Sequence, residues 1–408
     1  MSSFFYFVDE VRTPFVINDI RRVAEKYETV YLFSIDRLQG KEALPENVVV
    51  FENFIDWTQF KPFRILFSNF FSILTIYLSE CIALQRFLPF KKSVAVLASN
   101  IFKAEQIVQI LSKHPPTFNF QLSTFYSFWF YDCIYLAWLK KKGKIKTAIT
   151  RAHGGDLYEE RSSLSGNILF RHFQMGYLDG VYSVSGAGTF YLQKKYSRYK
   201  RKIKTIFLGS SFHESLSRAK MEGEFVMVTC ARIRNIKRIH KVAEMLQHID
   251  FPLIWYHIGD ENLEAKNDTT IPKYIKAKEE LKTKGNITYI PLGQMENERI
   301  FEFYSVTPIN LFVSLSQNEG LPISMMEAAS FGIPVLSTDV GGCKEIVNEQ
   351  TGILIPLETE MKEVARIITN FKDSAKNTEE YRKGVRKFWE ENFDAEKNYE
   401  KLFEELEF

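Results

Sequence analysis

Cysteine, long apolar runs and a clear excess of charge are all scarce in this sequence, and each scarcity excludes a class of protein. Four cysteines are spread over 408 residues without a C-x-x-C pair, which argues against a disulfide framework and favours a reducing compartment. No 18 uninterrupted apolar residues occur, so no membrane-spanning helix is expected. The N-terminus lacks a basic region and meets Asp9 and Glu10 early, which makes it a poor signal peptide. We therefore expect a cytoplasmic protein.

The motifs of several enzyme classes are missing as well. Gly186 and Gly188 begin a G-x-G, but the third glycine of the dinucleotide-binding fingerprint is absent. There is no P-loop, no H-E-x-x-H and no D-x-D, so neither an NTPase nor a metal site is expected. No nucleic-acid-binding motif occurs, and nucleic acid is not an expected partner.

The formal net charge of +3 hides an uneven distribution. Residues 1–210 carry 28 Lys or Arg and 17 Asp or Glu, a net of +11, whereas residues 211–408 carry 25 and 33, a net of −8. Such a difference between halves suggests that the first half meets something anionic.

What the sequence does contain is a regular alternation of apolar strands and amphipathic helices. Strands are predicted at 4–8, 29–34, 48–51, 93–98, 147–151, 180–184, 204–208, 225–230, 253–258, 286–290, 310–315, 334–338 and 352–355. Helices are predicted at 17–27, 101–113, 128–142, 237–249, 272–284, 295–304 and 322–331. This pattern favours parallel sheets, and at roughly 150 residues per domain the length suits two doubly wound α/β domains.

The expected domains are residues 1–208 and 209–388, both Rossmann-like, followed by a helix at 389–408 that packs back on the first domain. Ligands of doubly wound sheets bind at the carboxyl ends of the strands. The natural site in such a chain is the cleft between the two domains.

The most informative segment follows the apolar strand 310–315. Glu319 lies in the loop, Pro322 suits the first turn of a helix, and Glu327 lies on that helix. The helix N-terminus, with Gly320, Leu321, Pro322 and Ile323, is a candidate anion site. Two carboxylates on either side of an anion suit the hydroxyl groups of a sugar–diphosphate–nucleoside. The alternative is a loop carboxylate at 319 and a solvated helix residue at 327.

Other strand ends carry further candidates. Arg232 and Lys237 follow strand 225–230 and could bind a diphosphate, although a basic loop that merely starts a helix fits as well. The turns at Gly259-Asp260 and Pro291-Leu292-Gly293 suit backbone contacts to a base.

In the first half, His153 precedes two glycines at the end of strand 147–151, as a cleft residue would. Asp156 is a candidate for orienting it or for binding an acceptor. Tyr126 and Trp129 could stack on sugar rings. A structural histidine and aromatic residues used for core packing are the alternatives.

The order of these motifs resembles the retaining glycosyltransferases of family 4, which have the GT-B fold. The resemblance rests on A-R-I-R-N-I-K, H-I-G-D, P-L-G and E-G-L-P-I-S-M-M-E-A-A-S-F-G-I-P-V-L-S-T-D-V-G-G, and it covers about residues 225–356. The run R-A-H-G-G-D-L-Y-E-E-R in the first half looks like that of bacterial members that build lipopolysaccharide, capsule or exopolysaccharide. One departure is Gly320-Leu321-Pro322, where members often carry G-F-G.

The resemblance implies a role for each candidate. Arg232 and Lys237 would bind the donor diphosphate, Glu319 the donor sugar and Glu327 the ribose hydroxyls. His153 would contact the donor sugar near the reaction centre. The first domain would hold the acceptor and the second the UDP- or GDP-linked sugar. Metal-independent transfer with retention at the anomeric carbon is expected.

The stretch 61–92 is apolar and aromatic but too polar to span a bilayer. Basic runs at 140–144 and 194–202 add to the charge of the first half. They suggest that this half sits on the anionic inner leaflet and takes a lipid-linked saccharide acceptor. A buried helix with solvated ends is the alternative. For the whole chain, the other functions considered are a GT-B nucleotide-sugar epimerase and a non-catalytic membrane-surface scaffold.

Overall fold

The chain folds into two compact units. A computed structural model describes residues 3–9, 14–38, 44–113, 123–161, 168–219, 222–259 and 270–406. The first unit comprises Met1–Ile206 together with Phe403–Phe408, and the second comprises Phe207–Leu402. Each unit has its own parallel sheet and its own hydrophobic core.

The first unit is a seven-stranded sheet of order β3-β2-β1-β4-β5-β6-β7 within the described residues. Its strands are β1 (Phe4–Val8), β2 (Val30–Ser34), β3 (Val48–Glu52), β4 (Thr124–Ser127), β5 (Thr147–Ala152), β6 (Gly180–Ser183) and β7 (Ile203–Thr205). Its helices are α1 (Pro14–Lys26), α2 (Pro62–Ser68), α3 (Phe70–Leu84), α4 (Phe90–Ser112), α5 (Ile134–Lys141), α6 (Gly154–Leu157), α7 (Arg171–Tyr177) and α8 (Gly186–Lys195).

The second unit is a six-stranded sheet of order β10-β9-β8-β11-β12-β13 within the described residues. Its strands are β8 (Phe225–Cys230), β9 (Leu253–Ile258), β10 (Ile287–Gly293), β11 (Leu311–Ser314), β12 (Val335–Thr338) and β13 (Gly352–Ile355). Its helices are α9 (Ile239–Leu246), α10 (Ile271–Lys282), α11 (Asn297–Val306), α12 (Ile323–Ser330), α13 (Cys343–Ile346), α14 (Met361–Lys372) and α15 (Glu379–Asn392), and α16 (Ala395–Leu406) ends in the first unit.

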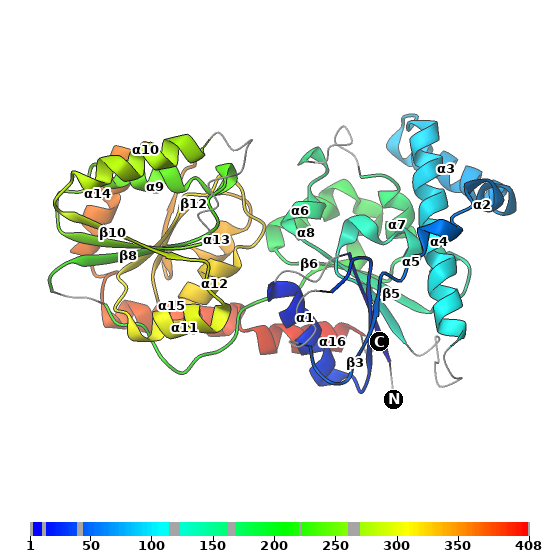
Figure 1. Ribbon diagram of the computed structural model, residues 1–408, viewed down its shortest axis with the longest axis horizontal. Coiled ribbons are helices and arrows are strands. Elements are labelled where there is room, and N and C mark those ends of the chain that lie inside the picture. Colours follow the sequence, from blue (N-terminus) through cyan, green and yellow to red (C-terminus); the bar gives the residue numbers. More distant parts are fainter. Residues whose placement is uncertain are drawn as a thin grey trace. The chain divides into compact units, whose positions relative to one another are not determined.

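Helices cover both faces of each sheet (Figure 1). In the second unit, α9 and α10 lie on one face and α11, α12 and α15 on the other (Figure 1). This explains why the strands are continuously apolar: all five residues of β1 are buried, as are five of the six in β8. The predicted α/β class with two doubly wound sheets is confirmed.

The strands of the first unit differ from the prediction in three places. The run 93–98, expected as a strand, lies inside α4, where Leu97, Ile101 and Ala104 are buried at helical spacing. A short apolar run fits either structure, and packing against α5 selects the helix. Strand β4 pairs with β1 at the centre of the sheet and is not among the predicted strands. The strand expected at 204–208 is the shorter β7.

The second unit extends further along the chain than residue 388. Ser210, at its beginning, is held by the Trp389 indole (Nε1 to Oγ, 2.9 Å) and by backbone hydrogen bonds to Phe393 and Ala395. A Cβ at Gly209 would lie 2.6 Å from the Phe393 carbonyl oxygen. The segment after residue 388 therefore closes the second unit before the chain reaches Phe403.

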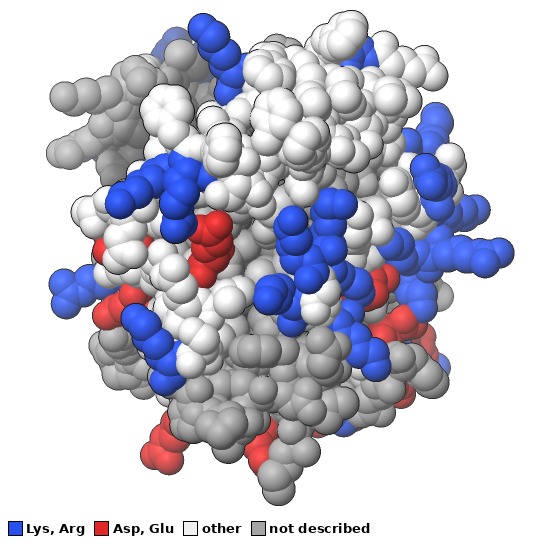
Figure 2. Space-filling model, turned by 90° about the vertical axis from the view of Figure 1, so that its right-hand side faces the viewer, with Lys and Arg blue, Asp and Glu red and all other residues white. Residues whose placement is uncertain are grey.

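One helix among the described residues, α4, is long and apolar enough to cross a membrane, and half of its most apolar window is buried inside the protein. The pair α2 and α3 passes the same test only when joined, and the two helices meet at a bend of 82°. Unlike α4, this pair exposes many of its apolar side chains, on the side of the molecule shown in Figure 2.

Candidate functional site

The predicted residues of the second unit gather where its strand order reverses. Strands β8 and β11 are neighbours at the centre of the sheet, and their connections leave in opposite directions. Lys237 follows β8 and Glu319 follows β11, so both emerge at the carboxyl ends of these two strands. This is the position at which doubly wound sheets bind ligands.

Lys237 and Glu319 form an ion pair, with Nζ 2.6 Å from Oε1. A short 3-10 turn, Asn235–Lys237, aims the lysine, and the amide of Gln317 donates to the carbonyl of Ile236 at 2.8 Å. The two loops are therefore joined through their backbones as well as through their charges. The lysine side chain is 31% exposed and the glutamate 10%, so the pair is partly accessible to solvent at the carboxyl ends of the strands.

The predicted anion site at the start of α12 has the expected geometry. Leu321 and Pro322 are buried, while Gly320 and Ile323 are half-buried. Pro322 occupies the N-cap position, and no side chain caps the helix. The first N–H groups of an uncapped helix, together with its dipole, favour a negatively charged ligand.

A pair of glycines positions this loop. Gly341 has a φ of +54°, and a Cβ there would lie 1.9 Å from the carbonyl oxygen of Glu319. The amide of Gly342 donates to the carbonyl of Gly320 at 2.8 Å. Only residues without a side chain allow the loop after β12 to approach the Glu319 loop this closely. Sequence reasoning quoted this Gly-Gly pair but gave it no role.

Glu327 is buried on α12, and the alternative of a solvated helix residue is wrong. Its Oε1 accepts a hydrogen bond from the Asn297 amide at 3.2 Å. Burial raises the pKa of this carboxyl to about 7, because the charged form loses its hydration. A buried carboxylate with one neutral partner retains acceptor capacity for hydroxyl groups.

The remaining donor-side candidates lie on neighbouring strand ends. Arg232 is exposed just after β8, and no hydrogen bond or ion pair holds it within the described part of the chain. Leu292 is half-buried and belongs to β10 itself, which runs to Gly293, so the expected turn there is wrong. Gly259 packs against Ala231, where a Cβ would lie 2.0 Å from the carbonyl oxygen. Asp260 lies outside the described residues.

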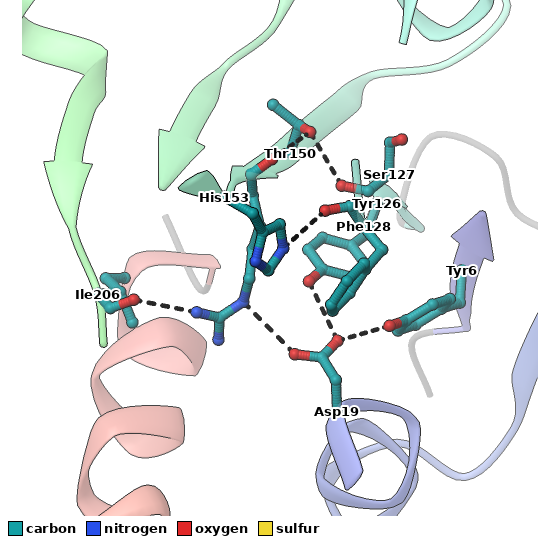
Figure 3. Close-up of polar contacts among 9 residues, drawn as sticks. Tyr6, Asp19, Tyr126, Ser127, Phe128, Thr150, His153 and Ile206 are labelled. Atoms are coloured by element: carbon teal, nitrogen blue, oxygen red, sulfur yellow. Dashed lines mark hydrogen bonds and ion pairs between the residues drawn. The ribbon is translucent and has the colours of Figure 1, made fainter. Parts of the chain in front are cut away.

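In the first unit, His153 follows β5 and is 7% exposed. Its ring stacks on Phe128 at 4.4 Å between centroids and touches Trp129 at 4.8 Å. Nε2 lies 3.0 Å from the carbonyl oxygen of Phe128, which can only accept, so this nitrogen carries the hydrogen (Figure 3). Burial, reinforced by the Arg151 charge, lowers the pKa of His153 to about 3. The imidazole is therefore neutral and is a poor general base at neutral pH.

Asp156 joins the loop after β5 to the loop after β4. Its Oδ1 accepts from the His153 amide at 2.7 Å, and its Oδ2 accepts from the Phe130 amide at 2.6 Å. Arg171 donates to the carbonyls of Asp156 and Phe130 at 2.8 and 3.1 Å. Burial raises the pKa of Asp156 to about 6. These contacts fit an orienting role, and a buried carboxylate occupied in this way does not fit acceptor binding.

The two aromatic candidates differ in exposure. Tyr126 in β4 is fully buried, and its hydroxyl donates to Asp19 at 3.0 Å, so its ring cannot stack on a sugar in this arrangement. Trp129 is half-buried beside His153, and its contact with a sugar stays a prediction.

Sequence reasoning missed a buried charge cluster next to His153. Asp19 of α1 accepts from Tyr6 at 2.7 Å and from Tyr126, and it lies 3.4 Å from Nε of Arg151 (Figure 3). The side chains of Asp19 and Arg151 are fully buried, and Arg151 also donates to the carbonyl of Ile206 at 3.0 Å. A signal was present: Asp19 lies on the same helix face as the apolar Val16, Ile20 and Val23.

Among the residues that the structure describes, no group of three His, Cys, Asp or Glu side chains is arranged to hold a metal ion. The positive charges at the predicted donor site come instead from Arg232, Lys237 and the start of α12.

The second unit matches a known family. Residues 212–388 match the family "Glycosyl transferases group 1". This range contains both glutamates, Arg232 and Lys237.

Curated relatives match shorter segments. An O-antigen biosynthesis glycosyltransferase of Escherichia coli, WbnH, is 42% identical over 64 residues, which cover 16% of this chain and 17% of that protein. A putative teichuronic acid biosynthesis glycosyltransferase of Bacillus subtilis, TuaC, is 28% identical over 145 residues, 35% of this chain and 36% of that one. The chain thus aligns with about a sixth to a third of the length of these relatives.

Solved structures match over the whole length. Anabaena Alr3699/HepE in complex with UDP has a TM-score of 0.72 at 14% identity, covering 100% of both chains. Its complex with UDP-glucose has a TM-score of 0.67 at 13% identity, again over 100% of both. The fold is therefore that of GT-B glycosyltransferases, and residues 212–388 match the glycosyl transferases group 1 family.

Proposed function

We propose that this protein is a retaining glycosyltransferase that moves a hexose from a UDP- or GDP-linked donor to a saccharide acceptor in cell-surface polysaccharide synthesis. The observation that carries the proposal is the Lys237–Glu319 pair at the centre of the second sheet, beside the uncapped start of α12. A cation, a helix N-terminus and a carboxylate at one sheet edge suit a diphosphate bonded to a sugar.

The two carboxylates would divide the donor between them. Glu319, paired with the lysine, would accept hydrogen bonds from sugar hydroxyls. Glu327, on the next helix, would accept from the ribose hydroxyls, because a buried carboxylate gains most from such donors. Arg232 is the second cation in this assignment, and its exposed side chain is available to a bound phosphate.

The reaction would be driven by electrostatic stabilisation of the leaving group. The nucleoside diphosphate gains negative charge as its bond to the anomeric carbon breaks. Lys237, Arg232 and the N–H groups of α12 stabilise that charge without a bound metal. We infer attack by the acceptor hydroxyl on the face from which the diphosphate departs, with its proton passing to the departing phosphate oxygen, which retains the anomeric configuration. His153, neutral and held by Phe128, would serve as a hydrogen-bonding partner of the donor sugar and not as the base.

The functions of the relatives support the pathway. They act in O-antigen and teichuronic acid biosynthesis, which are cell-surface polysaccharides. We propose a lipid-linked saccharide as the acceptor, used at the cytoplasmic face of the membrane.

A thermal-shift screen against UDP- and GDP-sugars tests donor binding, since a ligand of the native state raises the apparent Tm. We expect at least one nucleotide sugar to raise Tm in the presence of EDTA. Lys237→Ala should abolish the shift, whereas Lys241→Ala, which removes a surface lysine from α9, should preserve it. The absence of a shift with every nucleotide sugar would contradict the proposal.

Product analysis then separates the alternatives. A transferase extends an acceptor saccharide and releases the nucleoside diphosphate, and NMR of the product reports the anomeric configuration. A nucleotide-sugar epimerase converts the free donor without an acceptor. A non-catalytic scaffold gives neither product.

A further inference from the structure

The helices α2 and α3, with the residues that follow α3, expose an unusual concentration of aromatic side chains. Phe63, Phe67, Phe71 and Phe87 are 81–90% exposed, and Ile82 is 77% exposed. We call these five residues the aromatic corner, because α2 and α3 meet at an 82° bend. Single exposed apolar residues are ordinary in soluble proteins, but such a cluster on adjacent segments indicates a binding surface.

The aromatic corner is rigidly attached to the first unit. Glu80 of α3 is buried and accepts from the backbone amides of His172 and Phe173 at 3.0 and 2.9 Å. Tyr77, also on α3, donates to the carbonyl of Leu88 at 2.8 Å. Buried Ile65, Ile73 and Ile76 belong to the core of the same unit. The exposed rings are therefore presented by a fixed surface and not by a loose segment.

Two polar side chains in the segment of α2 and α3 are hydrogen-bonded to backbone carbonyls of these helices. The Thr75 hydroxyl donates to the carbonyl of Phe71 at 2.7 Å, and the Asn69 amide donates to the carbonyl of Ile65 at 3.1 Å. Since these groups have internal partners, they could enter an apolar environment at little cost.

The charges carried by residues 61–92 are nearly all positive. Residues 61–92 contain five Lys or Arg and a single acidic residue, Glu80, which points inward. Lys61, Arg86, Lys91 and Lys92 are exposed and make no ion pair with the described part of the chain. Figure 2 shows a broad uncharged area on this side, with Lys and Arg side chains along its border.

A groove of about 410 Å³ adjoins the corner. Arg64, Ser68, Glu105, Trp138, Lys142 and Lys144 contribute to its lining. Lys142 lies 4.6 Å from the Trp138 ring centre and 3.4 Å from the Ser72 hydroxyl, which connects the groove to α3. Arg64 is paired with Glu105, so the two lysines provide the positive charge that remains for a ligand.

We propose that this surface docks the protein on an anionic lipid bilayer, with the aromatic corner inserted among the acyl chains and the lysine-lined groove against lipid phosphates. Apolar insertion bordered by basic residues is the pattern of interfacial membrane binding. A second copy of the chain is a poorer occupant, because a twofold contact would bring the same basic border together. Peptide or protein partners would need acidic side chains to meet this border.

Flotation with vesicles of phosphatidylglycerol and phosphatidylethanolamine tests the proposal on the full chain. We expect the wild type to float with these vesicles and to bind phosphatidylcholine vesicles more weakly. The double variant Phe67→Ser, Phe71→Ser should lose at least tenfold in vesicle affinity, because two rings no longer enter the hydrocarbon. The matched control Phe190→Ser removes a 70% exposed phenylalanine from α8 and should stay within twofold of the wild type.

The groove is tested separately with Lys142→Gln, Lys144→Gln. We expect about a tenfold loss on anionic vesicles, a smaller salt dependence and no change on phosphatidylcholine. Failure of the wild type to float, or equal losses in the Phe67/Phe71 and Phe190 variants, would overturn the proposal. So would a dimer in solution that dissociates when Phe67 and Phe71 are replaced. Circular dichroism and nucleotide-induced Tm shifts on every variant separate these outcomes from misfolding and from a wrong donor assignment.

Discussion

The two sheets share a strand order around their centres but use that position differently. In the first unit, β1 and β4 are neighbours, and in the second, β8 and β11 are. Beside the first pair, Asp19, Arg151 and His153 are buried. Asp19 pairs with Arg151, and His153 is hydrogen-bonded to the carbonyl of Phe128. Beside the second pair, Lys237 and Glu319 form a single ion pair that is partly open to solvent.

This difference indicates that the first ion pair fixes the local structure and that the second is open to a ligand. A buried ion pair with tyrosine donors fixes one arrangement, because any change leaves a charge in a medium of low polarity. An ion pair that is partly exposed at the carboxyl ends of the strands can exchange partners with a ligand, because water screens each charge while the pair is broken. We therefore expect substitutions of the Asp19–Arg151 pair to act mainly on stability and substitutions of the Lys237–Glu319 pair to act mainly on turnover.

The largest effect should come from Asp19→Asn. The substitution removes the carboxylate beside the fully buried Arg151 and should destabilise the first unit by about 3–5 kcal/mol. Urea unfolding followed by fluorescence measures it. Arg22→Gln on the same helix breaks a surface pair with Glu25 and should cost about 0–1 kcal/mol. Equal costs for the two variants would mean that the buried pair stabilises the first unit no more than a surface pair does.

Glu319→Ala and Lys237→Ala should each reduce turnover by about 10²-fold, the loss typical of one transition-state partner. The doubly exchanged variant Lys237→Glu, Glu319→Lys sharpens the test. It preserves an ion pair, so Tm should recover toward the wild type, while turnover should not. Recovery of turnover would mean that the pair is structural, like the one in the first unit.

Gly341→Ala should have an intermediate effect. Its Cβ would lie 1.9 Å from the carbonyl oxygen of Glu319, at a φ of +54° that alanine adopts at a cost. The loop must shift, so we expect a loss of about 1–3 kcal/mol in stability and a clear fall in turnover. Gly384→Ala on α15, where nothing lies within 4 Å, should be neutral or slightly stabilising. Tm and steady-state kinetics of both variants provide the check.

Stability should depend on pH with opposite signs in the two units. The pKa of His153 is lowered to about 3. Its contribution to the free energy of unfolding is therefore complete above pH 6.5 and is lost as the pH falls below that value. The pKa of Glu327 is raised to about 7, so stability falls as the pH rises from 4.5 to 7. Each slope should reach at most about 1.4 kcal/mol per pH unit.

Tm profiles of His153→Gln and Glu327→Gln against the wild type measure these slopes. His153→Gln should flatten the profile below pH 4.5, and Glu327→Gln should flatten it above pH 6.5, because the two ranges overlap only between these values. The exposed control Glu298→Gln on α11 should flatten neither. Flattening below pH 4.5 by Glu327→Gln, or above pH 6.5 by His153→Gln, would contradict the assignments.

The sequence predicted the second unit well because its signals are local. Continuous apolar strands mark β8 to β13, and the residues that follow β8 and β11 meet because parallel strands end at one edge. The Lys237–Glu319 contact follows from that topology, although the two residues are 82 positions apart.

The first unit was predicted less well because its site depends on distant packing. Leu97 and its neighbours fit a strand or a helix, and only contact with α5 decides between them. The burial of Tyr126 and the partners of Asp19 depend on a contact across 107 positions; the helix face of Asp19 indicates burial but not its partners. Gly341 could have been interpreted only once the neighbouring loop was known.

The closure of the second unit by residues beyond 388 has a practical consequence for recombinant fragments. A fragment of the second unit that stops at the end of the family match would lack Trp389 and Phe393, and Ser210 would lose its hydrogen-bond partners at the start of the unit. A fragment spanning 207–402 retains them. The complementary fragment, 1–206, would lack Phe403, whose ring contacts Tyr27 at 6.0 Å, and would need the C-terminal segment supplied as a peptide.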